Sequence, residues 1–255
     1  MTDTNCGKLR VLFGWYPRTL EQFMAKNLDG VERFFVSETN NLLADVRACD
    51  VYVWDKRKNE PASNFCIGAG LARAFGKPTI CLQSKEHPGL HTAKELADTL
   101  HFIARRKRNG RSTANLADPL PPDVPRASTS APLRLHFIGN YCDSSNKIVS
   151  EICADHTDRA VVVNDWWKTL RVKNFGVNVE EELSHVCNAD VVVMDVGICD
   201  DSDMCELAGV ILGMGKCLVI VRFSHQRLCP VLQSASVTSN DDLRALLRRL
   251  VKANF

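Results

Sequence analysis

Short apolar runs alternate with amphipathic stretches along most of the chain. Val11–Phe13, Val51–Asp55 and Pro78–Leu82 are apolar runs without the strict alternation of a half-exposed strand. Continuous runs of this kind are typical of strands buried on both faces, as in a parallel sheet covered by helices. Three later runs have the same character, namely Leu135–Ile138, Val191–Asp195 and Cys217–Val221.

Helical spacing of apolar positions fills the stretches between these runs. The helices expected at Asn41–Ala48 and Val179–Cys187 each precede a strand that ends in Asp. A helix rich in small residues follows each of those strands and stops at Gly-Lys. Closing helices are expected at Thr92–Lys107 and Asn240–Lys252. The chain therefore alternates strand and helix.

The two halves of the chain resemble each other. Ser63 to Lys77 (SNFCIGAGLARAFGK) aligns without gaps with Ser202 to Lys216 (SDMCELAGVILGMGK), at a constant offset of 139. Repeated self-similarity of this kind indicates a tandem repeat. We predict an α/β protein with two tandem flavodoxin- or Rossmann-like domains, at residues 1–107 and 133–255. Each domain is expected to be a parallel sheet covered by helices on both faces, with ligands beyond the carboxyl ends of the strands.

Residues 108–132 have the composition of a linker. This segment is rich in Ser, Thr and Asn and contains five of the ten prolines, so it is expected to be flexible. The basic cluster Arg105–Arg108 stands just before it. We interpret that cluster as a charged helix end that runs into a solvated tether, and the alternative is a nuclear localisation signal.

Composition narrows the class of protein. The chain is 45% hydrophobic and 24% charged with a net charge of +2, so we do not expect a nucleic-acid partner. No apolar run is long enough for a membrane helix, and the first residues do not resemble a secretory signal. The eleven cysteines contain no Cys-x-x-Cys pair and several fall in apolar patterns. We therefore expect a reducing, cytoplasmic location and neither a metal site nor a cofactor, with the nucleus as the alternative through Arg105–Arg108.

Acidic residues gather at the expected strand ends of the second half. Glu206 lies among Met204, Cys205 and Leu207, where burial of a carboxylate is costly unless the group is paired or used. At the offset of 139, Glu206 aligns with Ile67 and Asp200 aligns with Pro61. The first half keeps the scaffold without either acid, so we interpret both as chemical rather than structural.

At these positions the sequence resembles the nucleoside 2-deoxyribosyltransferase superfamily, which includes the 2′-deoxynucleoside 5′-phosphate N-hydrolases. The similar residues are Asp200, the run Cys205-Glu206-Leu207-Ala208-Gly209 and Gly215-Lys216 before an apolar strand. An earlier acid of the family falls on Glu182. The resemblance implies that Glu206 is the nucleophile at the anomeric carbon, and that Asp200 and Glu182 recognise the base and protonate it as it leaves.

The remaining candidates are substrate-binding residues. His136 stands where the resemblance implies a Tyr that hydrogen-bonds the nucleophile. The loop after the first strand of the second half offers Gly139, Asn140, Ser144 and Ser145, and its serines with Lys147 could hold a 5′-phosphate, although an ordinary polar loop is the alternative. One residue of the pair Trp166-Trp167, assigned here to Trp166, is expected to stack on a base.

Cleavage of an N-glycosidic bond by a carboxylate nucleophile then fits a (deoxy)nucleoside or nucleoside 5′-monophosphate as substrate, with water or a second base as acceptor.

The two halves differ in charge. The first half carries 19 basic and 14 acidic residues through residue 131, and the second half carries 13 basic and 16 acidic residues. We expect the two domains to dock, and homo-oligomerisation stays open. Trp15, Tyr16 and Arg18 could contribute to the site, although ordinary surface loop residues are the alternative. The alternative function is a catalytically inactive protein that binds a nucleotide or serves as a subunit of a larger complex.

Overall fold

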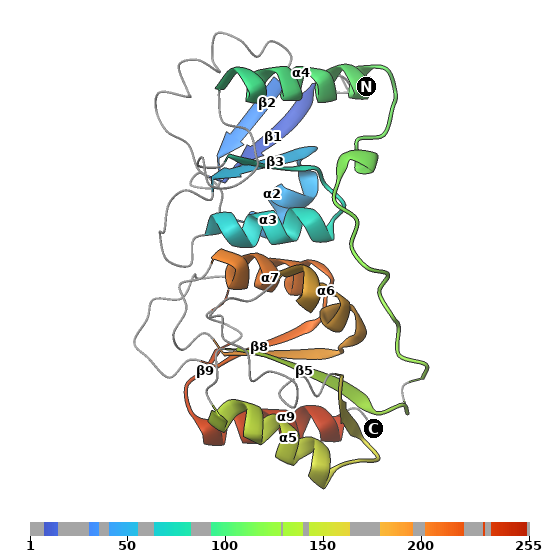
Figure 1. Ribbon diagram of the computed structural model, residues 1–255, viewed down its shortest axis with the longest axis vertical. Coiled ribbons are helices and arrows are strands. Elements are labelled where there is room, and N and C mark those ends of the chain that lie inside the picture. Colours follow the sequence, from blue (N-terminus) through green and yellow to red (C-terminus); the bar gives the residue numbers. More distant parts are fainter. Residues whose placement is uncertain are drawn as a thin grey trace. The chain divides into compact units, whose positions relative to one another are not determined.

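The computed structural model describes the two halves as two compact units, residues 1–120 (unit 1) and 121–255 (unit 2) (Figure 1). The division falls at Leu120 and Pro121, inside the predicted linker 108–132. Among the described residues, no helix is long and apolar enough to cross a membrane. The described residues are 8–14, 31–35, 41–55, 64–82, 93–128, 130–139, 143–163, 179–195, 202–221, 232 and 236–253.

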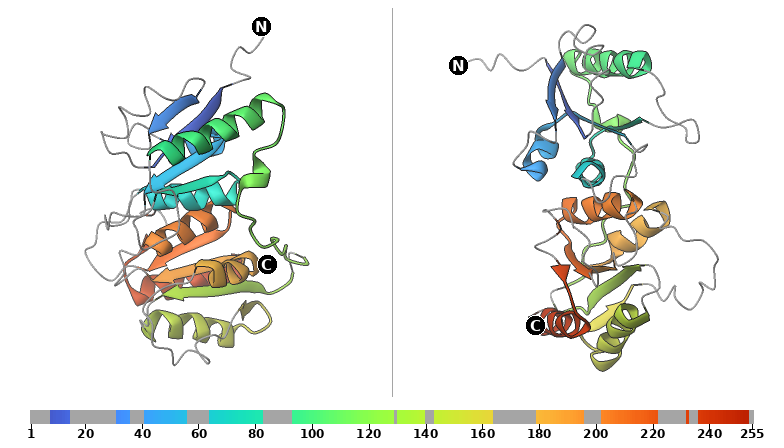
Figure 2. Two further views of the ribbon diagram at one scale, coloured as in Figure 1. Left: turned by 45° about the horizontal axis from the view of Figure 1, so that its top comes forward. Right: turned by 90° about the vertical axis from the view of Figure 1, so that its left-hand side faces the viewer.

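Unit 1 is a four-stranded parallel sheet with helices on both faces. Its strand order is β2-β1-β3-β4, so the first described strand lies in the interior of the sheet and the later strands are added on both sides of it. Helices α2 and α3 pack together on one face and α4 covers the other (Figures 1 and 2). The elements are β1 (Leu9–Phe13), β2 (Val31–Phe35), α2 (Leu42–Ala48), β3 (Val51–Asp55), α3 (Asn64–Ala74), β4 (Thr79–Leu82), α4 (Ala93–Arg108) and the 3-10 turn η2 (Ala114–Leu116).

Unit 2 repeats this plan with one more strand. Its order is β6-β5-β7-β8-β9 and every pair is parallel. Helices α5 and α9 pack on one face, and α6 and α7 on the other (Figures 1 and 2). The elements are β5 (Leu133–Gly139), α5 (Asp143–Asp155), β6 (Ala160–Val162), α6 (Val179–Asn188), β7 (Val191–Asp195), α7 (Ser202–Gly213), β8 (Cys217–Val221), β9 (Ser236–Val237) and α9 (Asn240–Ala253).

Two flavodoxin- or Rossmann-like α/β domains in tandem are thus confirmed. The sequence pattern did not predict β2, β6 and β9. The last two have only three and two residues, too few to show a period, and they flank the sheet at its edges. Strand β2 has the sequence VERFF, in which the charged residues Glu32 and Arg33 interrupt the apolar run.

The side chains of each central strand divide between the two faces. Leu133, Leu135 and Phe137 of β5 belong to the core that includes residues of α5 and α9. Since neighbouring side chains of a strand point to opposite faces, His136 and Ile138 face α6 and α7. Both are fully buried or nearly so. A polar ring at the centre of this layer is the first sign that the second face of unit 2 differs from an ordinary apolar core.

A carboxylate fixes the register of the central strands in both units. Asp50, just before β3, accepts a hydrogen bond from the backbone N–H of Arg10 at 2.7 Å and donates its own N–H to the Arg10 carbonyl at 2.8 Å. Asp190 and Arg134 make the same pair of contacts in unit 2, at 2.9 and 2.8 Å. Burial alone would raise the pKa of Asp190, but the hydrogen bonds and charge of Arg134 outweigh it and hold that pKa below its ordinary value.

The shared Gly-Lys of the repeat ends a helix in the same way in each unit. Gly76 and Gly215 have φ of 62° and 71°. The N–H of Lys77 binds the carbonyl of Ala72, and the N–H of Lys216 binds that of Ile211, which is the Schellman arrangement. The ammonium of Lys216 then reaches the carbonyls of Cys187 and Ala189, at 3.1 and 2.7 Å.

Part of the predicted linker belongs to unit 2. We call residues 121–124 the strap. The Cys187 thiol donates to the Pro121 carbonyl, the Val124 N–H to the Cys187 carbonyl, and Lys216 to Asp123, at 3.3, 3.3 and 2.8 Å. Arg134 closes the set with a bond of 2.7 Å to the Val124 carbonyl. The strap is therefore bound at both its ends, and flexibility of the whole linker stays a prediction.

We expect Gly215→Ala to lower the free energy of unfolding by about 1–2 kcal/mol, because a Cβ is unfavourable at positive φ. Nothing lies within 4 Å of the added Cβ, so the cost comes from the backbone alone. Gly215→Asn is the control, since Asn tolerates this conformation better than Ala does. Urea unfolding of the three proteins measures the difference. Equal destabilisation by Ala and Asn would contradict the backbone explanation.

Candidate functional site

A buried histidine–carboxylate pair lies under the carboxyl edge of the unit 2 sheet. The Nε2 atom of His136 on β5 is 2.6 Å from Oε2 of Glu182 on α6. The His136 side chain is fully buried and that of Glu182 is 15% exposed. A contact this short is a hydrogen bond, and which of the two atoms donates depends on the tautomer of the ring. Two residues that the sequence analysis placed in the site separately are thus directly bonded.

The other nitrogen of His136 makes this pair unusual. Its Nδ1 atom is buried and has no hydrogen-bond partner among the described residues. An unsatisfied polar atom in an interior costs roughly 1–3 kcal/mol, so such an atom is expected to have a partner in the working protein. The imidazole is therefore available to hydrogen-bond a further group within unit 2.

His185, one turn along α6 from Glu182, completes a cluster of three titratable groups. The rings of His136 and His185 are tilted at 37° with centroids 5.3 Å apart. Burial lowers the pKa of His185, and the neighbouring His136 lowers it further, against the opposing effect of Glu182. His185 is thus biased toward its neutral form beside the pair.

Unit 1 provides an internal comparison for the pair. The strand registers match Leu12 to His136, since Leu12 lies opposite Tyr52 and His136 opposite Val192. Counting back eight residues from Asp50 and from Asp190 matches Leu42 to Glu182. Leu12 and Leu42 are 1% and 7% exposed. The same scaffold thus buries two leucines at the positions where unit 2 buries an imidazole and a carboxylate.

A second polar pair lies at the carboxyl end of the central strands, on the opposite face. Ser145 in the first turn of α5 donates to Oδ2 of Asp195, the last residue of β7, at 3.1 Å. Both side chains are buried. Gly139 lies opposite Asp195 in the register, and a Cβ there would come within 2.8 Å of the Asp195 Cβ. Gly139 thus permits the close approach of this carboxylate.

The predicted phosphate ligands occupy different environments. Ser144 is half-buried at the start of α5, and Ser145 is already engaged by Asp195. Lys147 is 75% exposed on the surface of α5, 4.0 Å from Glu151. Phosphate binding by Ser145 would require its hydroxyl to leave a carboxylate that repels the phosphate. This role of the loop stays a prediction.

Glu206 is half-buried in the second turn of α7, which packs beside α6. Its neighbours Met204, Cys205 and Leu207 are buried. Because helices of this fold start at the carboxyl edge of the sheet, Glu206 and Glu182 both lie within two turns of that edge. The structure joins Glu182 to His136, and it places Glu206 on the adjacent helix.

The other candidates from the sequence lie outside the described residues, namely Asp200, Asn140, Trp166, Trp167, Trp15, Tyr16 and Arg18.

Two polar residues of the site were missed by the sequence analysis. Asp195 is a buried carboxylate at the end of a strand. The sequence could have indicated it, because the corresponding strands of both halves end in an aspartate, Asp55 and Asp195. His185 lies three residues after Glu182, which is helical spacing for two side chains on one face. Among the described residues no group of three or more His, Cys, Asp or Glu side chains is arranged to hold a metal ion.

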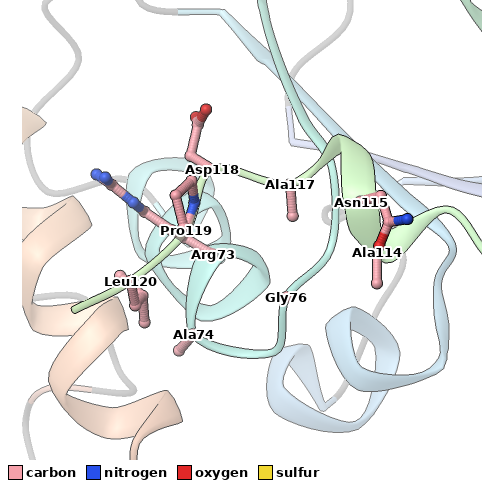
Figure 3. Close-up of a pocket in the computed structure, with 9 residues that line it drawn as sticks. All are labelled: Arg73, Ala74, Gly76, Ala114, Asn115, Ala117, Asp118, Pro119 and Leu120. Atoms are coloured by element: carbon pink, nitrogen blue, oxygen red, sulfur yellow. The ribbon is translucent and has the colours of Figure 1, made fainter. Parts of the chain in front are cut away.

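Unit 1 has a cavity at a different place. It measures about 440 Å³ and lies between the end of α3 and residues 114–120 (Figure 3). No residue of the predicted site lines it. Its lining is Arg73, Ala74, Gly76, Ala114, Asn115, Ala117, Asp118, Pro119 and Leu120.

Comparisons with known proteins leave the family open. No family model and no curated protein matches the chain. The C-terminus of E. coli RcsC, with its linker region and phosphoreceiver domain, is 16% identical over 97% of this chain and 95% of its own, with a TM-score of 0.30. The catalytic subunit of cobaltochelatase from Mycobacterium tuberculosis is 11% identical over 96% of this chain and 27% of its own, with a TM-score of 0.26.

A third solved structure, a mutant of a manganese-bound periplasmic metal-binding protein from Candidatus Liberibacter asiaticus, is 11% identical. It covers 97% of this chain and 100% of its own, with a TM-score of 0.24. Similarities this low carry no argument about function. The site must therefore be interpreted from its own residues.

A double-mutant cycle tests the His136–Glu182 pair. We expect Glu182→Leu or His136→Leu alone to lower the free energy of unfolding by about 1–3 kcal/mol, because each leaves a buried polar group without its partner. The double variant recreates the apolar pair of unit 1. Its free energy of unfolding should therefore fall by less than the sum of the decreases in the two single variants. Chemical denaturation measures all four proteins. Strict additivity would show that the two side chains are not coupled.

The lowered pKa of His185 predicts a dependence of stability on pH. The unfolded chain takes up a proton at His185 more readily than the folded protein, so stability falls as the pH drops below about 6.5. We expect His185→Gln to weaken this loss. His156→Gln, in the turn after α5, is the matched control, and its free energy of unfolding should change with pH as that of the parent does. Urea unfolding at a series of pH values measures the slopes, and identical slopes for His185→Gln and the parent would contradict the prediction.

Proposed function

We propose that unit 2 cleaves or transfers at the N-glycosidic bond of a (deoxy)nucleoside or nucleoside 5′-monophosphate. The observation that carries this proposal is the buried His136–Glu182 pair, at positions where unit 1 keeps the leucines Leu12 and Leu42. The fold does not require the pair, and a buried imidazole bonded to a carboxylate is expensive to maintain. Its retention under the carboxyl edge of a Rossmann-like sheet supports a chemical role.

Glu206 is the nucleophile in this proposal. Its carboxylate attacks the anomeric carbon, and the bond to the base nitrogen breaks with its electron pair leaving on the base. The positive charge that develops on the sugar is stabilised by the same carboxylate. The half-buried setting of Glu206 among apolar neighbours excludes part of the water that would otherwise screen this interaction.

Glu182 and Asp200 recognise the base and protonate it. The hydrogen bond between Glu182 and His136 makes the pair suited to give a proton to a leaving base nitrogen and to recover one later from the acceptor. His136 thereby positions Glu182, and its Nδ1, which has no partner among the described residues, is available to the substrate. Water as acceptor gives hydrolysis, and a second base gives transfer.

The second candidate function is a catalytically inactive protein that binds a nucleotide or serves as a subunit of a larger complex. The observation in its favour is unit 1, which keeps the sheet, the helix ends and the Asp–backbone contacts although Leu12 and Leu42 replace the polar pair. One copy of the domain has therefore persisted without these groups.

Release of free base decides between the two functions. Purified full-length protein is incubated with ribo- and deoxyribonucleosides and their 5′-monophosphates, with and without a second base, and the bases are separated by chromatography. We expect release or exchange with at least one substrate, and Glu206→Gln should reduce it by about a thousandfold or more. Asp203→Asn, on the preceding turn of the same helix, is the matched control and should keep the activity.

Equal losses in Glu206→Gln and Asp203→Asn would contradict the role of Glu206. If no substrate releases a base while unfolding experiments show the parent to be folded, the inactive alternative is supported. Added base incorporated into a new nucleoside identifies a transferase.

A further inference from the structure

An aromatic side chain on the outer face of α4 has no role in the core of unit 1. Leu96, Leu100 and Ile103 point inward and are at most 3% exposed, whereas Phe102 is 51% exposed. Only a few large apolar side chains among the described residues are exposed, and Phe102 is exposed most. A single exposed aromatic side chain is common on a protein surface, so its meaning depends on the side chains that surround it.

Four arginines surround the carboxyl end of the same helix. Arg105, Arg106 and Arg108 lie in its last turn. Gly110, with φ of 68°, turns the chain so that the Arg111 N–H binds the Arg106 carbonyl at 2.9 Å, which keeps Arg111 beside that turn. Lys107 is separate from this group, because its ammonium binds Asp50 at 2.6 Å.

The guanidinium of Arg106 joins the two features. Its central carbon lies 5.8 Å from the centroid of the Phe102 ring, within the range of a cation–π contact. Within the described part of the chain, none of the four arginines forms an ion pair with a carboxylate, and residues 99–112 contain no acid. The surface formed by Phe102, Arg105, Arg106, Arg108 and Arg111, here named the α4 surface, thus combines an aromatic face with unneutralised positive charge.

Helix α9 of unit 2 shows that the aromatic residue is a specific feature of α4. The buried positions Leu96 and Leu100 correspond to Leu243 and Leu247. This alignment puts Arg249 of α9 at the place of Phe102. The last turn of α4 holds four basic residues, whereas that of α9 holds only Lys252, preceded by Arg248 and Arg249. Positive charge near the helix end is thus common to the repeat, and the exposed ring is found on α4 alone of the two.

We propose that the α4 surface binds single-stranded nucleic acid. One base stacks on the exposed ring of Phe102, and the phosphates on either side bind Arg105, Arg108 and Arg111. Aromatic platforms flanked by cations are the usual means of holding single strands without reading their sequence. Arg106 supports the ring from one side and adds its charge to the same strand.

A membrane surface fits these residues less well. Lipid insertion requires a broad apolar face, and the apolar face of α4 is occupied by the core of unit 1. Phe102 is the single large apolar side chain that the outer face offers.

The net charge of the whole chain is only +2 and gives no indication of nucleic-acid binding. The positive charge that matters here is concentrated at the α4 surface.

Fluorescence anisotropy with full-length protein tests the proposal. The probes are short fluorescein-labelled oligothymidine and oligouridine, titrated at several salt concentrations. We expect Phe102→Ala to weaken binding by about 5-fold to 100-fold without changing the salt dependence. Phe102→Trp should restore it. The double variant Arg105→Gln/Arg108→Gln should reduce the slope of log affinity against log salt by about 1.4, or 0.7 for each lost phosphate contact.

The matched control is Arg248→Gln/Arg249→Gln on α9, which removes the same two charges from the corresponding helix of unit 2. It should bind like the parent. Equal losses in the α4 and α9 double variants would overturn the proposal in favour of unspecific charge attraction. Absence of binding to both oligonucleotides would also overturn it, as would binding to phosphatidylserine vesicles in their place. Preference between the two probes identifies DNA or RNA as the partner.

Discussion

The contact between a carboxylate and the backbone of the neighbouring strand holds both units in register. A parallel pair of strands has no hairpin to align it, so the alignment must come from the ends of the strands or from their side chains. Asp50 and Asp190 provide it by bonding to the N–H of Arg10 and Arg134. A shift by one residue would turn His136 toward α5 and α9, and the site could not form.

The two units show how much chemistry one scaffold can gain or lose. Leu12 and Leu42 give unit 1 an apolar layer under the sheet, whereas His136 and Glu182 give unit 2 a polar pair at the same depth. The leucines gain free energy from burial, while the polar pair must recover through one short hydrogen bond the cost of leaving water. The difference in interior thus arises without a change of strand order or of the helix ends.

The sequence predicts well what depends on local pattern. Repeated apolar runs predict the central strands, and the repeated Gly-Lys predicts the helix ends, because both are governed by residues close together in the chain. The edge strands β6 and β9 are too short to show such a pattern.

The bond between His136 and Glu182 could not be predicted, since it joins residues 46 apart and depends on how α6 lies on the sheet. Asp195 was missed for a related reason. The sequence shows an Asp at the end of a strand, but only the packing of Gly139 and Ser145 shows that it is buried. Long-range packing therefore determines which of the polar residues act together.

The strap also has a consequence for the order of synthesis. Asp123 meets its partner Lys216 only after 93 further residues have been made. At about 5–20 residues per second, that interval lasts roughly 5–20 seconds. The described strands of unit 1 all end before residue 83, so this unit can assemble on the ribosome during this time, before the Asp123–Lys216 contact forms. Because domains generally fold as units, with the N-terminal one first, this delay favours assembly of the two units one after the other and disfavours mispairing between their similar strands.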